Sequence, residues 1–301
     1  MTNKKTVHVL LFTLFISILL LNVPSAFSQI NKKSVLWKIS GNGLKQPSYL
    51  FGTVHILDSS NYFLHKTVIE KITKCNKMVF EVNTNEPDYQ KKALQFSFMS
   101  NDSLENIFTK EEYQNLEQFF KKEFNFPLSA VHKMKPFYLS SVINALSMSK
   151  NAMSYEAELK KIATENGLGI SGISTLEKEN EIIEKMDMEV QKYTLYQAIE
   201  EHKTGYKHRE QIVLLYKKKD IQGIYELMKR ENSKEDSIVY DIMFPKRHEV
   251  WIPNIIKLMY EYSCFFAVGV GHLPGEYGLL SILIKEGYKV KPVNMDFKFH
   301  D

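Results

Sequence analysis

The sequence predicts an α/β protein with a partly parallel central sheet and a large helical insertion. Short apolar runs typical of buried strands lie towards both ends of the chain, at residues 34–39, 48–54, 77–82 and 264–273. The long middle stretch is instead rich in Lys and Glu with regularly spaced apolar residues, as in amphipathic helices. In sheets of this class, reactive groups gather where parallel strands end. The polar residues that follow the predicted strands are therefore the first candidates for a functional site.

The first 28 residues have the features of a secretory signal peptide. Two lysines precede an apolar run at about residues 7–23, and Ala26-Phe27-Ser28 forms a small-x-small cleavage pattern. We expect cleavage between Ser28 and Gln29, which leaves a single domain of residues 29–301 that is secreted or periplasmic. An uncleaved N-terminal anchor is the alternative, because the apolar run is nearly long enough to span a bilayer.

Composition and charge narrow the function classes. A hydrophobic content of 44% with mixed charges is typical of a globular domain rather than a disordered chain. The formal net charge of +4 falls to about +2 when the two lysines of the signal peptide are lost, because that segment contains no acidic residue. We therefore expect no nucleic-acid partner, and no stable membrane insertion after cleavage. The two cysteines, Cys75 and Cys264, each lie just before a strand-like run. They could form a disulfide if these strands are neighbours.

The N-terminal elements follow from local patterns. The apolar runs 34–39 and 48–54 flank a Gly-Asn-Gly turn, which predicts two paired strands. Residues 61–76 have the apolar spacing of a helix. The run "KMVFEV" (77–82) is short, β-branched and aromatic, as in a buried strand.

The helical insertion is expected to span about residues 86–262. Within it, Thr109 followed by two glutamates marks a helix start, and Pro136 fits the first turn of another helix. The segment "LGISGIS" (168–174) is a strand candidate inside this span. After the insertion, "CFFAVGVGHL" is the clearest buried strand of the chain. The last elements expected are a helix and then a strand, at residues 276–286 and 289–293.

Two copies of a G-x-x-H pattern follow predicted strands: Gly52 to His55 and Gly269 to His272. A glycine at a strand end lets the backbone turn or approach a bound group closely. Glu81 ends a third strand. If these strands are neighbours, two imidazoles and a carboxylate converge, a set that can hold a divalent metal with positions left for water and substrate. Taken singly, each histidine could equally be a packed core residue, and Glu81 a solvent-facing or ion-paired side chain.

The stretches "LWKISGNGLKQPSYLFGTVHIL" and "FFAVGVGHLPGEYGLLSILIKEGYKVKPV" resemble the TraB/GumN family, which includes the Tiki Wnt-inactivating metalloproteases. The resemblance implies a fold related to the erythromycin-esterase (EreA) and ChaN-like group. It also implies a metal-dependent hydrolase, specifically a peptidase acting on a peptide or protein substrate. The implied metal ligands are His55, His272 and Glu81, and the implied metal is Mn or Co, with Zn possible. Glu81 is either a ligand or the general base, and Arg247 is placed to stabilise oxyanion charge.

This chain departs from the family pattern at several positions. The family's Arg-Asn pair is Arg247-His248 here, and a family glutamate is replaced by Ser174. Glu156 stands where the family usually has an aspartate, while Lys135-Pro136 matches a Lys-Pro element. The departures leave the three implied metal ligands intact. An activity that depends on the acidic residues of the middle segment is not implied for this chain.

Two alternatives remain open from the sequence. One is a non-catalytic envelope protein that holds a metal or haem through the same histidines. The other is a metal-free hydrolase in which a histidine acts as the base. Sensitivity to chelators distinguishes the two hydrolases, and turnover of a peptide distinguishes both from the binding protein.

Overall fold

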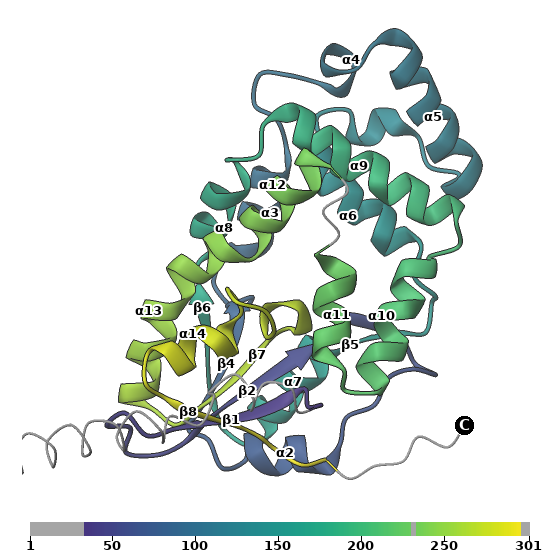
Figure 1. Ribbon diagram of the computed structural model, residues 1–301. Coiled ribbons are helices and arrows are strands. Elements are labelled where there is room, and N and C mark those ends of the chain that lie inside the picture. Colours follow the sequence, from purple (N-terminus) through teal and green to yellow (C-terminus); the bar gives the residue numbers. More distant parts are fainter. Residues whose placement is uncertain (1–32, 230–232, 296–301) are drawn as a thin grey trace, which may run out of the picture.

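The structure is a computed structural model that describes residues 33–229 and 233–295 (Figure 1). The expected signal peptide, residues 1–28, lies outside the described residues. Within the described ranges, no helix combines the length and apolar character needed to cross a membrane.

A six-stranded sheet in the order β6-β4-β7-β2-β1-β8 forms the centre of the fold (Figure 1). β2, β7, β4 and β6 run parallel to one another, and β1 is antiparallel to both of its neighbours. The predicted α/β class with a partly parallel sheet is therefore confirmed. The strands of this sheet are β1 (Leu36–Ser40), β2 (Ser48–Thr53), β4 (Lys77–Val82), β6 (Gly169–Ser174), β7 (Cys264–Gly269) and β8 (Lys289–Pro292).

The strand β7 is inserted between β4 and β2, although it comes late in the chain. Every residue of β7 is buried, because helices cover both faces of the sheet. The helices α13 (Pro245–Glu261) and α14 (Leu279–Lys285) lie on one face, and α2 (Lys66–Ile72) and α7 (Tyr155–Glu165) lie on the other (Figure 1). The continuous apolar sequence of β7 reflects this two-sided burial.

The remaining helices lie above the carboxyl edge of the sheet (Figure 1). Those at 207–228 contribute to the core around the sheet, and most of the others form a second body. Its own apolar core includes Leu116, Phe120 and Leu195. The expected helix start at Thr109 is confirmed as a reciprocal capping box with Glu112, and Pro136 occupies the first turn of its helix, as expected. These helices are α3 (Tyr89–Ser97), α4 (Leu104–Ile107), α5 (Lys110–Phe124), α6 (Pro136–Leu146), α8 (Leu176–Ile183), α9 (Met188–Lys203), α10 (Lys207–Lys217), α11 (Ile221–Met228) and α12 (Lys234–Met243).

A two-stranded sheet that the sequence did not predict joins β3 (Ile56–Asp58) to β5 (Ala152–Ser154). Each strand has only three residues, too few to give a readable alternation of apolar and polar positions. The pairing places the start of β3 opposite the end of β5, with Ile56 facing Ser154. His55, just before β3, and Tyr155, just after β5, are therefore brought together.

The two cysteines lie at the start of neighbouring strands, since Lys77 of β4 is in register with Cys264 of β7 and Cys75 precedes β4. Both are free, buried thiols in the structure. Burial raises the pKa of the Cys75 thiol to about 11 and that of Cys264 to about 12. Both side chains thus belong to the core rather than to a reactive site.

Candidate active site

The two G-x-x-H segments meet at the carboxyl edge of the sheet. β2 and β7 are parallel neighbours, with Thr53 in register with Gly269, so the residues after them leave the sheet side by side. A Cβ added to Gly52 would lie 2.7 Å from the side chain of Leu273, directly after the second motif. A Cβ added to Gly269 would lie 3.0 Å from Nε2 of His55. Each glycine therefore makes room for the other segment.

The imidazole of His55 is oriented by Glu156. Backbone pairing of β3 with β5 places these residues together, and the Tyr155 amide donates a hydrogen bond to the His55 carbonyl at 3.2 Å. Nδ1 of His55 then lies 2.8 Å from Oε1 of Glu156. Since the carboxylate can only accept, Nδ1 donates, and Nε2 is the nitrogen left for the site.

The carboxylate of Glu156 is itself held by two hydroxyl groups. Oγ1 of Thr53 donates to Oε1 at 2.7 Å, and Oγ of Ser154 donates to Oε2 at 3.2 Å. Burial lowers the pKa of His55, but the hydrogen bond to Glu156 and the charges of Glu81 and Glu156 outweigh it and raise that pKa to about 9. The His55 side chain remains 59% exposed, so it is the accessible member of the site.

Glu81, at the end of β4, is fixed through both of its oxygens. Oε1 accepts from the backbone N–H of Gly269 at 2.7 Å, and Oε2 accepts from Nη2 of Arg247 at 2.7 Å. Burial raises the pKa of Glu81, but the charges of Arg247 and His55 and the hydrogen bond from the Gly269 backbone together hold it well below its usual range. Glu81 is therefore a permanently charged carboxylate rather than a group that exchanges a proton near neutral pH.

Arg247, on α13, bridges two carboxylates, the half-buried Glu81 and the buried Glu179. Besides Glu81, it contacts Glu179 on α8, with Nε donating to Oε2 at 2.5 Å. Oε1 of Glu179 accepts from Nε1 of Trp251 at 2.8 Å, and the Arg247 guanidinium carbon lies 4.4 Å from the centroid of the Trp251 ring. The arginine is thus fixed by charge on its edge and by an aromatic ring on its face.

His272 lies in a buried chain of hydrogen bonds. Nη1 of Arg247 lies 3.1 Å from Nε2 of His272, and Nδ1 of His272 lies 2.8 Å from Nε2 of His248. Nδ1 of His248 lies 2.6 Å from the carbonyl oxygen of Tyr277. Because arginine only donates and a carbonyl only accepts, both histidines are neutral with their proton on Nδ1. Burial agrees with this: it lowers the pKa of His248 to about 4 and that of His272 well below its usual value.

The site carries an excess of negative charge. Three carboxylates (Glu81, Glu156 and Glu179) face two cations, Arg247 and protonated His55, and His272 is neutral. Such an excess at a buried site favours a further cation or a held proton. Replacement of the His55 proton by a divalent ion would bring these groups to charge balance.

The nitrogen and oxygen atoms at this site are of the kinds that bind a divalent metal. Nε2 of His272 and Oε1 of Glu81 are 3.7 Å apart, and Nε2 of His55 borders the same glycine, Gly269, as Oε1 of Glu81. Two imidazoles and one carboxylate are the ligand set of several catalytic zinc sites. No three His, Cys, Asp or Glu side chains in the described part of the chain are already arranged to hold an ion. Metal binding would require Nε2 of His272 to exchange its bond with Arg247 for one with the ion.

The structure thus brings together all four residues that the sequence singled out: His55, Glu81, Arg247 and His272. It adds Glu179 and His248, which the sequence had not placed in the site. Two family-matched positions have other roles. Lys135 donates to the carbonyl of Phe96 at 2.7 Å and pairs with Glu184, and Oγ of Ser174 donates to the neighbouring Thr175 carbonyl at 3.5 Å.

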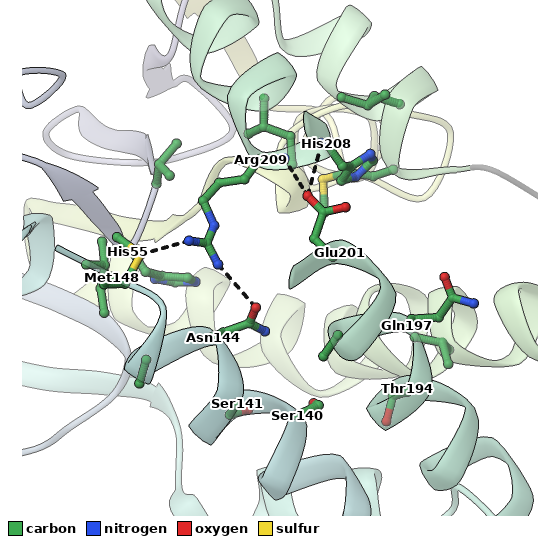
Figure 2. A pocket seen from close by; sticks show the side chains of 18 of the residues that line it. His55, Ser140, Ser141, Asn144, Met148, Thr194, Gln197, Glu201, His208 and Arg209 are labelled. Carbon is green, nitrogen blue, oxygen red and sulfur yellow. Dashed lines mark hydrogen bonds between the residues drawn. The ribbon is translucent and has the colours of Figure 1, made fainter. Parts of the chain in front are cut away.

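A cleft of about 870 Å³ opens beside His55, between the sheet edge and the helical body (Figure 2). Residues of α6, α9 and α10 form much of its wall, and Figure 2 shows His55, Arg209 and Asn144 among the residues that line it. The size suits several residues of a peptide or a similarly large ligand. The cleft gives the exposed histidine direct access to a ligand.

Fold and site together define an α/β protein with two histidines, an ion-paired arginine and a carboxylate at the sheet edge, of which His55 lines a cleft. The sequence profile of the TraB/PrgY/gumN family matches residues 35–292, and the chain belongs to this family. It is 20% identical over 319 residues to the metalloprotease TIKI2 of Danio rerio, an alignment that covers 88% of this chain. The aligned region spans 62% of that relative's length. No solved structure matches the chain significantly.

Proposed function

We propose that this protein is a metal-dependent hydrolase that cleaves peptide bonds. The observation that carries the proposal is the meeting of His55, Glu81 and His272 beside Arg247, with His55 lining the adjoining cleft. Family membership and the similarity to a metalloprotease support the same class. The substrate is a peptide or protein segment that enters the cleft.

In this proposal His55, Glu81 and His272 hold the metal, with Mn or Co expected and Zn possible. When bound, a divalent ion there would lower the pKa of a water molecule towards neutrality and polarise the scissile carbonyl. Glu156 fixes the His55 ring so that Nε2 faces the site. His248 does the same for His272, because it accepts the Nδ1 proton and leaves the Nε2 lone pair facing Glu81 and Arg247.

Glu81 acts as a ligand rather than as the general base. Both of its oxygens accept strong hydrogen bonds, and its pKa is held well below the usual range, so it has little affinity for a proton. Arg247 has five N–H donors, of which Glu179, Glu81 and His272 occupy three. Its two remaining donors can stabilise negative charge that develops on the carbonyl oxygen.

A metal-free hydrolase is the second candidate, and the His55–Glu156 pair is the observation that favours it. A histidine oriented by a carboxylate is a common acid–base arrangement. With a pKa raised to about 9, His55 is protonated at neutral pH and could donate that proton to the leaving amine.

The deciding experiment measures metal content and peptidase activity of purified residues 29–301 after reconstitution with Mn, Co or Zn. We expect near-stoichiometric metal and chelator-sensitive turnover of a quenched fluorescent peptide library. Both properties should be lost in His55→Ala and His272→Ala, and retained in His132→Ala, which alters an exposed histidine away from the cleft. Full activity in both site variants would refute the proposal, whereas turnover that resists chelators would support the metal-free hydrolase.

We also propose that the chain is exported through its N-terminal segment and released after cleavage. Mass spectrometry of the protein from an expressing cell should find Gln29 as the first residue of the extracytoplasmic form. A form that retains residues 1–28 in the membrane fraction would instead support the N-terminal anchor.

A further inference from the structure

Arg209 presents a cation to the cleft that His55 also lines. It lies in the first turn of α10, and Figure 2 shows its guanidinium group pointing into the cleft. Nη2 donates to Oδ1 of Asn144 at 3.2 Å, and Nη1 lies 3.2 Å from the sulfur of Met148. The guanidinium carbon lies 4.2 Å from the centroid of the Tyr206 ring. The side chain is therefore held in place from three sides.

None of these three partners carries a charge. Within residues 33–229 and 233–295, no carboxylate forms an ion pair with Arg209, in contrast to Arg247, which has two. The thioether of Met148 is a weak acceptor, and the amide oxygen of Asn144 is uncharged, so neither neutralises the positive charge of Arg209. The arrangement orients the guanidinium but leaves its charge uncompensated.

The two acidic side chains that line the cleft are engaged elsewhere. Oε1 of Glu201 accepts the backbone N–H groups of His208 and Arg209, at 3.0 and 3.1 Å, and so caps the start of α10 (Figure 2). Oδ1 of Asp236 accepts from the hydroxyl of Tyr193 at 2.7 Å. Glu201 thus orients the helix that carries Arg209 without pairing with its side chain.

A guanidinium in this state is suited to a carboxylate. Two of its five N–H donors are used by Asn144 and Met148, which leaves three for a ligand. Arginine binds a carboxylate through two parallel hydrogen bonds, and the pair is stronger in a cleft that is partly closed to water. An amide or a lysine of the ligand offers no comparable interaction.

We propose that Arg209 is a substrate-binding residue that pairs with a carboxylate of the peptide. The substrates are then peptides that carry an acidic side chain or a free C-terminal carboxylate where the chain lies against α10. This inference rests on the proposed peptidase function, and it assigns that function a substrate class.

The test compares four quenched fluorescent octapeptides of alanine and glycine. Two contain a central Asp or Asn with an amidated C-terminus, and two repeat these sequences with a free carboxylate. A hydrogen-bonded charge pair contributes on the order of 1.5–3 kcal/mol, so we expect kcat/KM to be roughly 10- to 100-fold higher for peptides that carry the preferred carboxylate. A preference for Asp would show that Arg209 binds a side-chain carboxylate. A preference for the free terminus would show that it binds the C-terminal carboxylate.

The preference should fall to a ratio near one in Arg209→Ala and be partly retained in Arg209→Lys. Lys207→Ala is the matched control, because it removes a positive charge from the exposed side of the same helix, outside the cleft. This control should keep the wild-type preference. Equal loss in Lys207→Ala would mean that net charge alone is responsible, and would overturn the proposal.

A binding measurement separates this inference from the proposed function. Fluorescence anisotropy of the same labelled peptides, with wild-type protein and Arg209→Ala, needs no turnover. Arg209-dependent binding without cleavage would retain the carboxylate site and reject the peptidase. Cleavage without any preference for a carboxylate would retain the peptidase and reject the role of Arg209. Absence of both binding and cleavage for the acidic peptides would reject both.

Discussion

The imidazole of His55 lies directly against the backbone of Gly269. A Cβ on this glycine would lie 3.0 Å from Nε2 of His55 and 3.5 Å from Oε1 of Glu81. The same residue donates its N–H to Glu81 at 2.7 Å. Gly269 is thus part of the site: its backbone anchors the carboxylate, and its lack of a side chain leaves space for the histidine.

Gly269→Ala should therefore reduce activity far more than stability. The added methyl group displaces His55 or Glu81, and a shift of about 1 Å in a catalytic group can cost on the order of 100-fold in rate. The kcat/KM for a cleaved peptide measures the loss, and urea denaturation checks the fold. Gly169→Ala is the control, because a Cβ there meets only the Lys77 side chain, at 3.7 Å. Wild-type activity in Gly269→Ala would contradict the role of this close approach.

Glu156→Gln should lower the pKa of His55 from about 9 towards its ordinary value, because the amide keeps a hydrogen bond but removes the charge. A histidine whose pKa is raised on folding stabilises the protein most below its unfolded pKa, about 6.5. That contribution is lost as the pH rises through about 9.

The free energy of unfolding in the presence of a chelator, measured from pH 5 to pH 9.5, tests this. The gap between wild type and Glu156→Gln should be widest below about pH 6.5 and narrow towards pH 9. NMR titration of the His55 ring gives its pKa directly. A gap that is independent of pH would show that the pair contributes no linked protonation.

Arg247→Ala should strongly destabilise the protein, since it leaves the half-buried Glu81 and the buried Glu179 without their shared cation. Removal of one partner from a buried ion pair costs about 3–5 kcal/mol. Urea denaturation gives the difference. Lys246→Ala, next to it in the sequence, removes an exposed lysine paired with Glu249 and should leave stability close to that of wild type. A stable Arg247→Ala protein would mean that water or protonation compensates the carboxylates.

His248→Leu should destabilise the protein by about 1–3 kcal/mol, because the Nδ1 proton of His272 loses its buried acceptor. His248→Asn restores the residue that the family pattern has at this place, and its amide oxygen can accept that proton. We therefore expect the asparagine variant to retain more stability and more activity than the leucine variant. Equal behaviour of the two would show that shape, not the hydrogen bond, is what His248 supplies.

The sequence predicted the parts of the site that follow from strand order. Apolar runs located β2, β4 and β7, and the repeated G-x-x-H pattern identified His55 and His272 as a pair. The parallel register of β2 and β7 then places the two motifs together, as the pattern implied. Glu81 could be selected because it is a charged residue at the end of an otherwise apolar strand, and the structure places that strand on the other side of β7.

The supporting residues could not be predicted, because their partners are set by packing between distant elements. Glu179 is one of several glutamates on α8, and only the placement of α13 against that helix shows that it contacts Arg247. The His55–Glu156 pair depends on two strands of three residues each, below the length at which periodicity can be read. His248 was recognised only as a departure from a family pattern.

The central position of β7 also determines when the candidate site can be assembled during synthesis and folding. Until residues 264–272 have been synthesised, β2 and β4 have no partner on their facing edges, and His272 and the Gly269 amide are absent. Closing a sheet by a late central strand requires contacts between segments far apart in the chain, which makes this step slow. A nascent or truncated chain therefore carries His55 and Glu81 without the residues that complete the candidate site. The topology thus delays assembly of the candidate site until synthesis has passed β7.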